Sequence, residues 1–183
     1  MKKTVFVIAL IAGLVSMQTV MAEGTGLALG LGISEAAGNL GVSAEITSPS
    51  FARDFLMVRV ESQADWLTDS AYASDDDIAG KCFSTHRLGL VGACGWCADM
   101  IRLYGEFGGI LCLPADVLTD DILQTGIYGL FGFEFFVARP SHSTVALYLE
   151  AGTNNLFGTA DELEGSPDYY SGFTTRTGFR YYF

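Results

Sequence analysis

The chain has 183 residues, half of them hydrophobic, and its 10 Lys and Arg against 21 Asp and Glu give a formal net charge of -11 at pH 7. Its length fits a single domain. The acidic balance excludes nucleic acid as an expected partner, because nucleic-acid binding requires clustered Lys and Arg.

The first 22 residues read as a secretory signal peptide, which leaves residues 23–183 as the mature domain. Lys2 and Lys3 form the charged start, and an apolar run follows at residues 5–15, too short to span a bilayer. A retained membrane helix is the alternative for this segment. No Cys directly follows the run, which argues against a bacterial lipoprotein anchor.

The mature sequence alternates apolar and polar residues in eight segments, and such alternation with period two is typical of β-strands. The predicted strands cover residues 25–33, 39–46, 55–66, 82–93, 100–111, 124–137, 144–152 and 172–183. No apolar stretch after the leader reaches the roughly 20 residues of a spanning helix. The chain is therefore predicted to be a soluble β protein or a membrane β-barrel.

The last segment shows the alternation most clearly. Phe173, Phe179 and Phe183 fall on one face, whereas Arg176 and Arg180 fall on the other. A soluble strand would bury the aromatic face, and a membrane strand would turn it to lipid.

The connections also alternate in character. Those after the third, fifth and seventh segments are long and acidic, and most of the others are short. Short turns at one end and longer loops at the other are typical of transmembrane barrels. With the mature N-terminus in the periplasm, the long loops would lie outside the cell.

The charged residues within the segments all share the face opposite the Leu and Phe residues. They are Glu45, Arg59, Glu61, Arg87, Arg102, Glu106, Glu134, Glu150, Arg176 and Arg180. Enclosed charges need partners, so five Glu balanced by five Arg favours a charged interior. A soluble lipocalin-type barrel or sandwich, with its charges outside, is the alternative. We predict an all-β, eight-stranded antiparallel up-and-down transmembrane β-barrel.

With its leader, its eight segments and its aromatic C-terminus, the chain resembles small eight-stranded bacterial outer membrane proteins of the OmpA/OmpX type and, more loosely, OmpW. The resemblance implies an outer membrane location and contact with outer membrane lipid. It also implies that Phe179, Tyr181 and Phe183 form a C-terminal signal read by the outer-membrane assembly machinery.

An eight-stranded barrel is just wide enough for side chains to fill it. Strand position predicts two layers of charge in the lumen. Glu45, Arg102, Glu134 and Arg180 form the layer nearer the periplasm, and the other six charged residues form a layer at mid-height. The layers could be a structural plug of ion pairs, or a gated narrow pore whose pairs switch partners.

Four cysteines follow the leader, and export makes disulfides available to them. The economical pairing joins Cys82 with Cys112 and Cys94 with Cys97. Redox chemistry or metal binding at the Cys-x-x-Cys is the alternative, but it lacks a thioredoxin-like setting and a second ligand pair.

The acidic loops offer carboxylate oxygens, which suit hard cations. Asp75, Asp76 and Asp77 are weak calcium candidates, because they lack the spacing of an EF-hand loop. A solvated acidic surface that meets a cationic or host ligand is the expected alternative.

Ser84 and His86 share one face and resemble outer-membrane lipid hydrolases in residue type alone. His142 lies in a predicted periplasmic turn, away from outer-leaflet chemistry. We therefore expect no enzyme, no metal and no cofactor. The predicted function is a structural or surface-interaction barrel, and the alternative is a narrow porin-like channel for small solutes.

Overall fold

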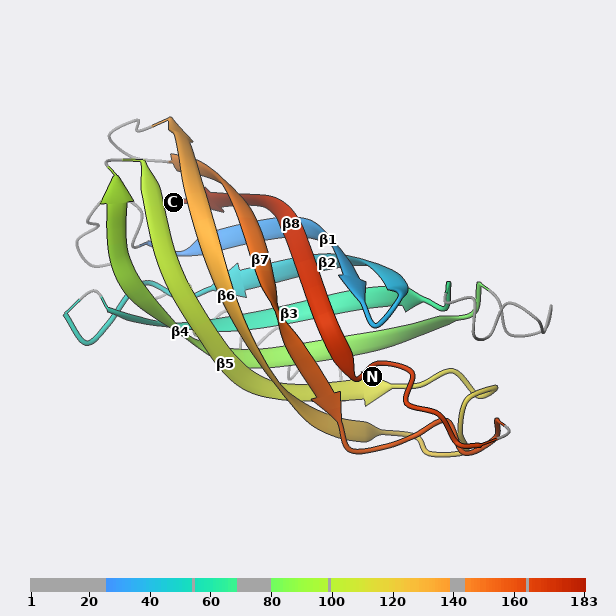
Figure 1. The fold of residues 1–183 in the computed structure, drawn as a ribbon. Coiled ribbons are helices and arrows are strands. Elements are labelled where there is room, and N and C mark those ends of the chain that lie inside the picture. Colours follow the sequence, from blue (N-terminus) through green and yellow to red (C-terminus); the bar gives the residue numbers. More distant parts are fainter. Residues whose placement is uncertain (1–25, 54, 69–79, 99, 139–143, 164) are drawn as a thin grey trace, which may run out of the picture.

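A computed structural model of the chain describes residues 26–53, 55–68, 80–98, 100–138, 144–163 and 165–183. Eight strands close into one barrel in which every strand pairs antiparallel with its neighbours in sequence and β8 pairs with β1 (Figure 1). The strands are β1 (Ala28–Ala36), β2 (Asn39–Thr47), β3 (Leu56–Trp66), β4 (Cys82–Ala98), β5 (Ile101–Leu113), β6 (Gln124–Ala138), β7 (Thr144–Leu156) and β8 (Gly172–Tyr182). The prediction of an eight-stranded antiparallel barrel is confirmed, and the predicted signal peptide lies outside the described residues.

β4 and β7 run furthest beyond their predicted ends. β4 continues to Ala98, past its predicted end at residue 93, because two irregularities in its pairing with β5, after Ala93 and after Trp96, accommodate the extra residues. β7 continues through Asn154 and Asn155, which have turn-like chemistry but pair in register with β6. Pairing with a neighbouring strand overrides local preference in both places.

The barrel is apolar outside and charged inside. Outward-facing Leu31, Phe107 and Leu147 are 52%, 65% and 52% exposed, whereas inward-facing Arg180 and Glu134 are 0% exposed. A sheet turns alternate residues to opposite faces, so the predicted alternation holds around the whole wall. The core of this protein is therefore the filled lumen of the barrel.

The connections gather at the two ends. A tight hairpin joins β1 to β2 through Ala37 and Gly38, which both have positive φ (50° and 84°), as a two-residue turn requires. The connections after β5 and β7 lie side by side at this same end, where the Glu162 amide donates to the Leu118 carbonyl at 3.1 Å (Figure 1). We call this the outer end, and the end that holds the C-terminus the inner end. Within the described residues, no helix is long and apolar enough to cross a membrane.

Candidate functional site

The structure places all ten predicted lumen residues inside the barrel, each at most 5% exposed. They come from every strand except β1. β1 contributes Gly30 between Glu45 and Arg180 in one rung of the sheet. A Cβ atom on Gly30 would lie 2.7 Å from Cγ of Glu45, so the glycine leaves room for the carboxylate and guanidinium to meet across it.

Arg180 is the centre of the pairing at the inner end. Its guanidinium contacts the carboxylates of Glu134 at 2.7 Å and Glu150 at 2.6 Å, and it also bonds Glu45. It donates to the Tyr104 hydroxyl at 2.7 Å and lies 3.9 Å from the centroid of the Tyr148 ring. Three carboxylates and two aromatic rings thus surround one buried cation.

Arg102 completes this end of the network. Its Nε donates to Glu134 at 2.7 Å, and its Nη2 donates to the Tyr182 hydroxyl at 2.5 Å. Tyr182 donates in turn to Glu134 at 2.6 Å. We name Glu45, Arg102, Tyr104, Glu134, Arg180 and Tyr182 the inner cluster.

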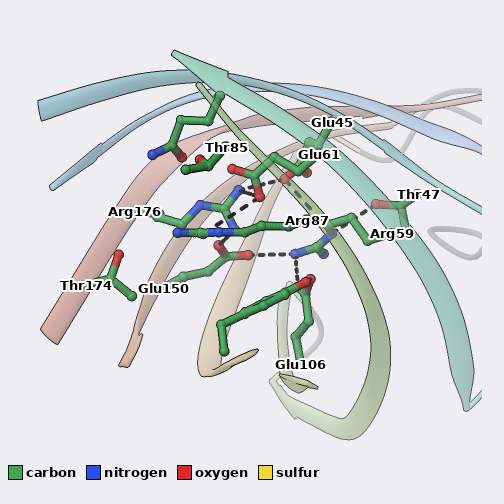
Figure 2. A network of polar contacts seen from close by, with 12 residues as sticks. Glu45, Thr47, Arg59, Glu61, Thr85, Arg87, Glu106, Glu150, Thr174 and Arg176 are labelled. Atoms are coloured by element: carbon green, nitrogen blue, oxygen red, sulfur yellow. Dashed lines mark hydrogen bonds and ion pairs between the residues drawn. The ribbon is translucent and has the colours of Figure 1, made fainter. Parts of the chain in front are cut away.

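The predicted two layers are in fact joined, because Glu150 spans them. Besides Arg180, Glu150 contacts Arg59 at 2.8 Å and Arg176 at 2.9 Å (Figure 2). Arg59 also meets Glu106 at 2.5 Å, and Arg176 also contacts Glu45 at 3.2 Å. The charges therefore form one network along the lumen, and the separation into layers was wrong.

Pairing is looser toward the outer end. Arg87 approaches Glu61 only to 3.9 Å and donates instead to the Tyr170 hydroxyl at 2.8 Å. Glu61 has its close ion pair with Arg176, at 2.5 Å. Asp65 accepts from Thr85 at 3.0 Å, and among the described residues no arginine nitrogen lies within ion-pair distance of it. The outer cluster comprises Glu61, Gln63, Asp65, Thr85, Arg87, Asn154 and Tyr170.

Buried polar atoms without a hydrogen-bond partner concentrate in this outer half. They include Oε1 of Gln63, Nε and Nη1 of Arg87, and Nδ2 of Asn154. In the inner cluster every side chain makes at least one direct hydrogen bond.

Apolar and aromatic side chains close the outer end of the lumen. These residues, which we name the aromatic cap, are Leu67, Phe83, Leu118, Ala160, Tyr169 and Tyr170, all at most 3% exposed. The rings of Tyr169 and Tyr170 meet Phe83 edge to face at 5.5 and 5.6 Å between centroids. Burial raises the pKa of Tyr170 to about 12 and also raises the pKa of Tyr169. The connection after β7 thus folds into the barrel, although its acidic sequence predicted a solvated loop.

The predicted disulfides are absent, since all four cysteines are free thiols. Cys82 pairs with outward-facing Trp66 and is exposed, whereas Cys112 points inward and its Sγ lies 3.4 Å from the Tyr169 hydroxyl. Cys112 stands opposite Thr85 in the register, so the Cys82–Cys112 pairing was wrong. Cys94 and Cys97 are both exposed, and neither forms a disulfide.

The aromatic residues of the C-terminus face outward. Phe179, Tyr181 and Phe183 are 46%, 37% and 46% exposed, and the Tyr181 and Phe183 rings lie 4.9 Å apart. The Phe183 amide donates to the Leu27 carbonyl at 2.9 Å, which fastens the last residue to the inner rim. Recognition of this end by an assembly machinery stays a prediction.

The remaining candidates make no catalytic or metal constellation. Ser84 and His86 face outward, and His86 pairs through Nδ1 with Ser62 Oγ at 3.0 Å, with no carboxylate bonded to either among the described residues. The described residues hold no cluster of three metal-ligating side chains. Three further candidates, Asp75, Asp76 and Asp77, and also His142, lie outside the described residues.

Tyrosines form a part of the site that the charge pattern did not identify. Tyr104 donates to Glu150, and Tyr128 donates to Glu106 at 2.5 Å. Tyr104 lies two residues from both Arg102 and Glu106, so the same alternation already placed it on the charged face. Asp65, near the end of the strand predicted at residues 55–66, is not among the predicted lumen residues, yet it is 0% exposed.

No protein-family model and no curated protein sequence matches the chain. Among solved structures, the chain is similar to the N-terminal β-barrel domain of Pseudomonas aeruginosa OprF, with a TM-score of 0.52 and 10% sequence identity. The match covers 88% of this chain and 100% of that domain. At this identity the similarity shows the fold alone, and it confirms the expected architecture, the closed barrel of small eight-stranded outer membrane proteins.

Proposed function

We propose that the chain is a bacterial outer membrane β-barrel with a structural or surface-interaction role, in which the lumen serves as a closed, ion-paired core. The single observation that carries the proposal is the inverted polarity of the wall. A soluble barrel would lose stability by exposing rows such as Leu29, Leu31 and Ile33 to water. In a bilayer the same rows meet lipid, and the closed sheet satisfies the backbone groups within the membrane.

A structural role is supported by how the lumen is filled. The inner cluster packs charge against charge across the barrel, and the aromatic cap covers the outer end. These side chains leave the connections, rather than the lumen, as the surface for contact. Asp116, Asp120 and Asp161 are exposed in the connections after β5 and β7, so this surface suits a cationic ligand or a bridging divalent ion.

A narrow channel is the second candidate, and the outer cluster favours it. The long Arg87–Glu61 approach and the buried Nε and Nη1 atoms of Arg87, which lack a hydrogen-bond partner, provide groups that could exchange partners as a path opens. Passage would require the aromatic cap to move and the inner cluster to separate. The second requirement is costly, because each buried charge would lose partners.

The proposal is tested by expressing the full chain in a diderm bacterium and separating the two membranes. We expect the protein in the outer membrane fraction, resistant to protease except in its connections, and migrating faster on gels before boiling than after it. Recovery as a soluble periplasmic protein would contradict the membrane barrel. Recovery in the outer membrane together with steady ion conductance would favour the channel.

A further inference from the structure

His86 occupies an unusual place in the wall of the barrel. Among the described strands, the outward-facing side chains that belong to Asp, Glu, Lys, Arg or His are Glu35 and His86. Glu35 lies beside the β1–β2 hairpin and accepts from the Gly38 amide at 2.8 Å. His86 instead pairs with Ser62, near the middle of β3. Ionisable side chains within membrane segments are rare and mark functional positions.

The pair uses only part of its hydrogen-bonding capacity. His86 Nδ1 and Ser62 Oγ are 3.0 Å apart. When the serine hydroxyl donates to Nδ1, the neutral imidazole carries its own proton on Nε2. Nε2 has no hydrogen-bond partner within the described part of the chain. Ser84, two residues away on the same face, supplies a hydroxyl that can accept.

A shallow recess of about 510 Å³ adjoins the pair on the outward face of β1, β2, β3 and β4. Small side chains form its floor, namely Ala44, Ser62, Ala64 and Ser84. Two larger apolar residues, Leu31 and Val42, also line it and are 52% and 47% exposed. Small residues that let backbones approach, with Ser and His as hydrogen-bonding groups, are the composition of contacts between membrane-embedded segments.

We propose that this patch, comprising Ala44, Ser62, Ala64, Ser84 and His86, is the contact through which two copies of the chain associate within the membrane. The inference rests on the proposed membrane barrel. Acyl chains offer no hydrogen-bond partner at the middle of a strand, so lipid would leave His86 Nε2 unsatisfied. A two-fold contact requires a self-complementary patch, and this one carries both a donor, His86, and an acceptor, Ser84. The small-residue floor lets the two walls come close enough for that bond.

The test uses the full mature protein in detergent and in phosphatidylcholine vesicles. Its mass is measured by sedimentation equilibrium at matched density, and association in vesicles by energy transfer between labelled copies as lipid is added. The variants are His86→Leu, which removes the donor, and Ser84→Leu, which fills the recess. Both substitutions make the wall more apolar, so they leave insertion intact. Thr153→Leu, a polar-to-apolar change on outward-facing β7, is the matched control.

We expect a dimer in the unaltered protein, an association about tenfold weaker in each patch variant, and no change in the control. An inserted protein that remains monomeric at low lipid-to-protein ratios would overturn the contact. So would a dimer that neither patch variant weakens, or a co-purifying lipid lost on His86→Leu while the protein stays monomeric. Failure to enter vesicles at all, seen as full digestion by protease, would contradict the membrane barrel itself and is thereby distinguished from failure of the contact.

Discussion

The inner and outer clusters of the lumen carry similar residues but pair them to different degrees. At the inner cluster Arg180 has three carboxylates within 2.7 Å, whereas at the outer cluster Arg87 approaches its nearest carboxylate at 3.9 Å. Buried polar atoms without a hydrogen-bond partner occur on Gln63, Arg87 and Asn154 of the outer cluster, and none of them belongs to the inner cluster.

The difference reflects what holds each cluster. Strand residues alone build the inner cluster, so the closed register fixes every partner. The outer cluster depends in addition on Tyr170, which reaches Arg87 from the connection after β7. An ion pair formed by strand residues alone is expected to keep its geometry. A side chain such as Arg87, whose hydrogen bond comes from a connection, can lose that bond when the connection moves.

The largest effect is expected from removing the central cation. Arg180→Met leaves Glu45, Glu134 and Glu150 short of a buried counter-charge, and should lower the free energy of unfolding by about 3–5 kcal/mol. Urea unfolding in vesicles, followed by tryptophan fluorescence, measures the change. Arg87→Met is the matched substitution in the outer cluster, and its cost should be clearly smaller. Equal costs would remove the distinction between the two clusters.

Alkaline pH should lower the stability of the protein through Tyr170 of the outer cluster, because burial favours the neutral form of this side chain. Its pKa is near 10 when unfolded and about 12 in the folded protein. The unfolded chain therefore loses its proton first as pH rises, so stability is complete below pH 10 and falls toward pH 12. The loss attributable to this group is about 2–3 kcal/mol. Unfolding measured at pH 9 and pH 12 should show a weaker pH dependence in Tyr170→Phe than in the unaltered protein. An identical dependence would contradict the buried position of this hydroxyl.

A smaller effect is expected from a glycine substitution that pushes two neighbouring strands of the barrel wall apart. Gly108 stands opposite Gly89, and a Cβ atom on Gly108 would lie 2.2 Å from the carbonyl oxygen of Leu88. Gly108→Ala must push the backbones of β4 and β5 apart, at a cost of about 1–3 kcal/mol in unfolding free energy. Gly105→Ala in the same strand meets only an oxygen at 3.9 Å and is the control. If the two variants are equally stable, the close approach of these strands is not needed.

The smallest effect is expected at Asp65. This carboxylate is buried without an arginine at ion-pair distance among the described residues, so Asp65→Asn removes a charge that pairing does not offset. The unfolding free energy should change by less than about 1 kcal/mol. Glu150→Gln, which leaves three arginines short of a partner, should cost about 3 kcal/mol in the same assay. A large loss on Asp65→Asn would reveal a pairing role for the outer carboxylate.

The strands and the inward face of the charged residues could be predicted from the sequence, because side-chain alternation is a local property of extended chain. Glu45 and Arg180 belong to strands that are not neighbours, so their contact across Gly30 depends on the closed register. The joining of the two layers through Glu150 therefore could not be predicted. The same register sets Cys112 opposite Thr85 and overturns the predicted disulfide with Cys82.

The aromatic cap could not be predicted for a different reason. Tyr169 and Tyr170 follow a run of acidic residues that includes Asp161, Glu162 and Asp168, and composition alone indicates a solvated loop. Their burial depends on Phe83 and Leu118, which lie far away in sequence. Only the folded barrel brings the three segments together.

The central claim, a lumen closed by paired charges, is tested most directly by conductance of the purified full chain in planar bilayers at several voltages and pH values. The structure predicts insertion without discrete current steps, because the inner cluster and the aromatic cap both obstruct the path. Arg180→Met in parallel would show whether the inner cluster is the barrier, by admitting current that the unaltered protein does not pass. Steady, voltage-independent steps from the unaltered protein would contradict the closed lumen.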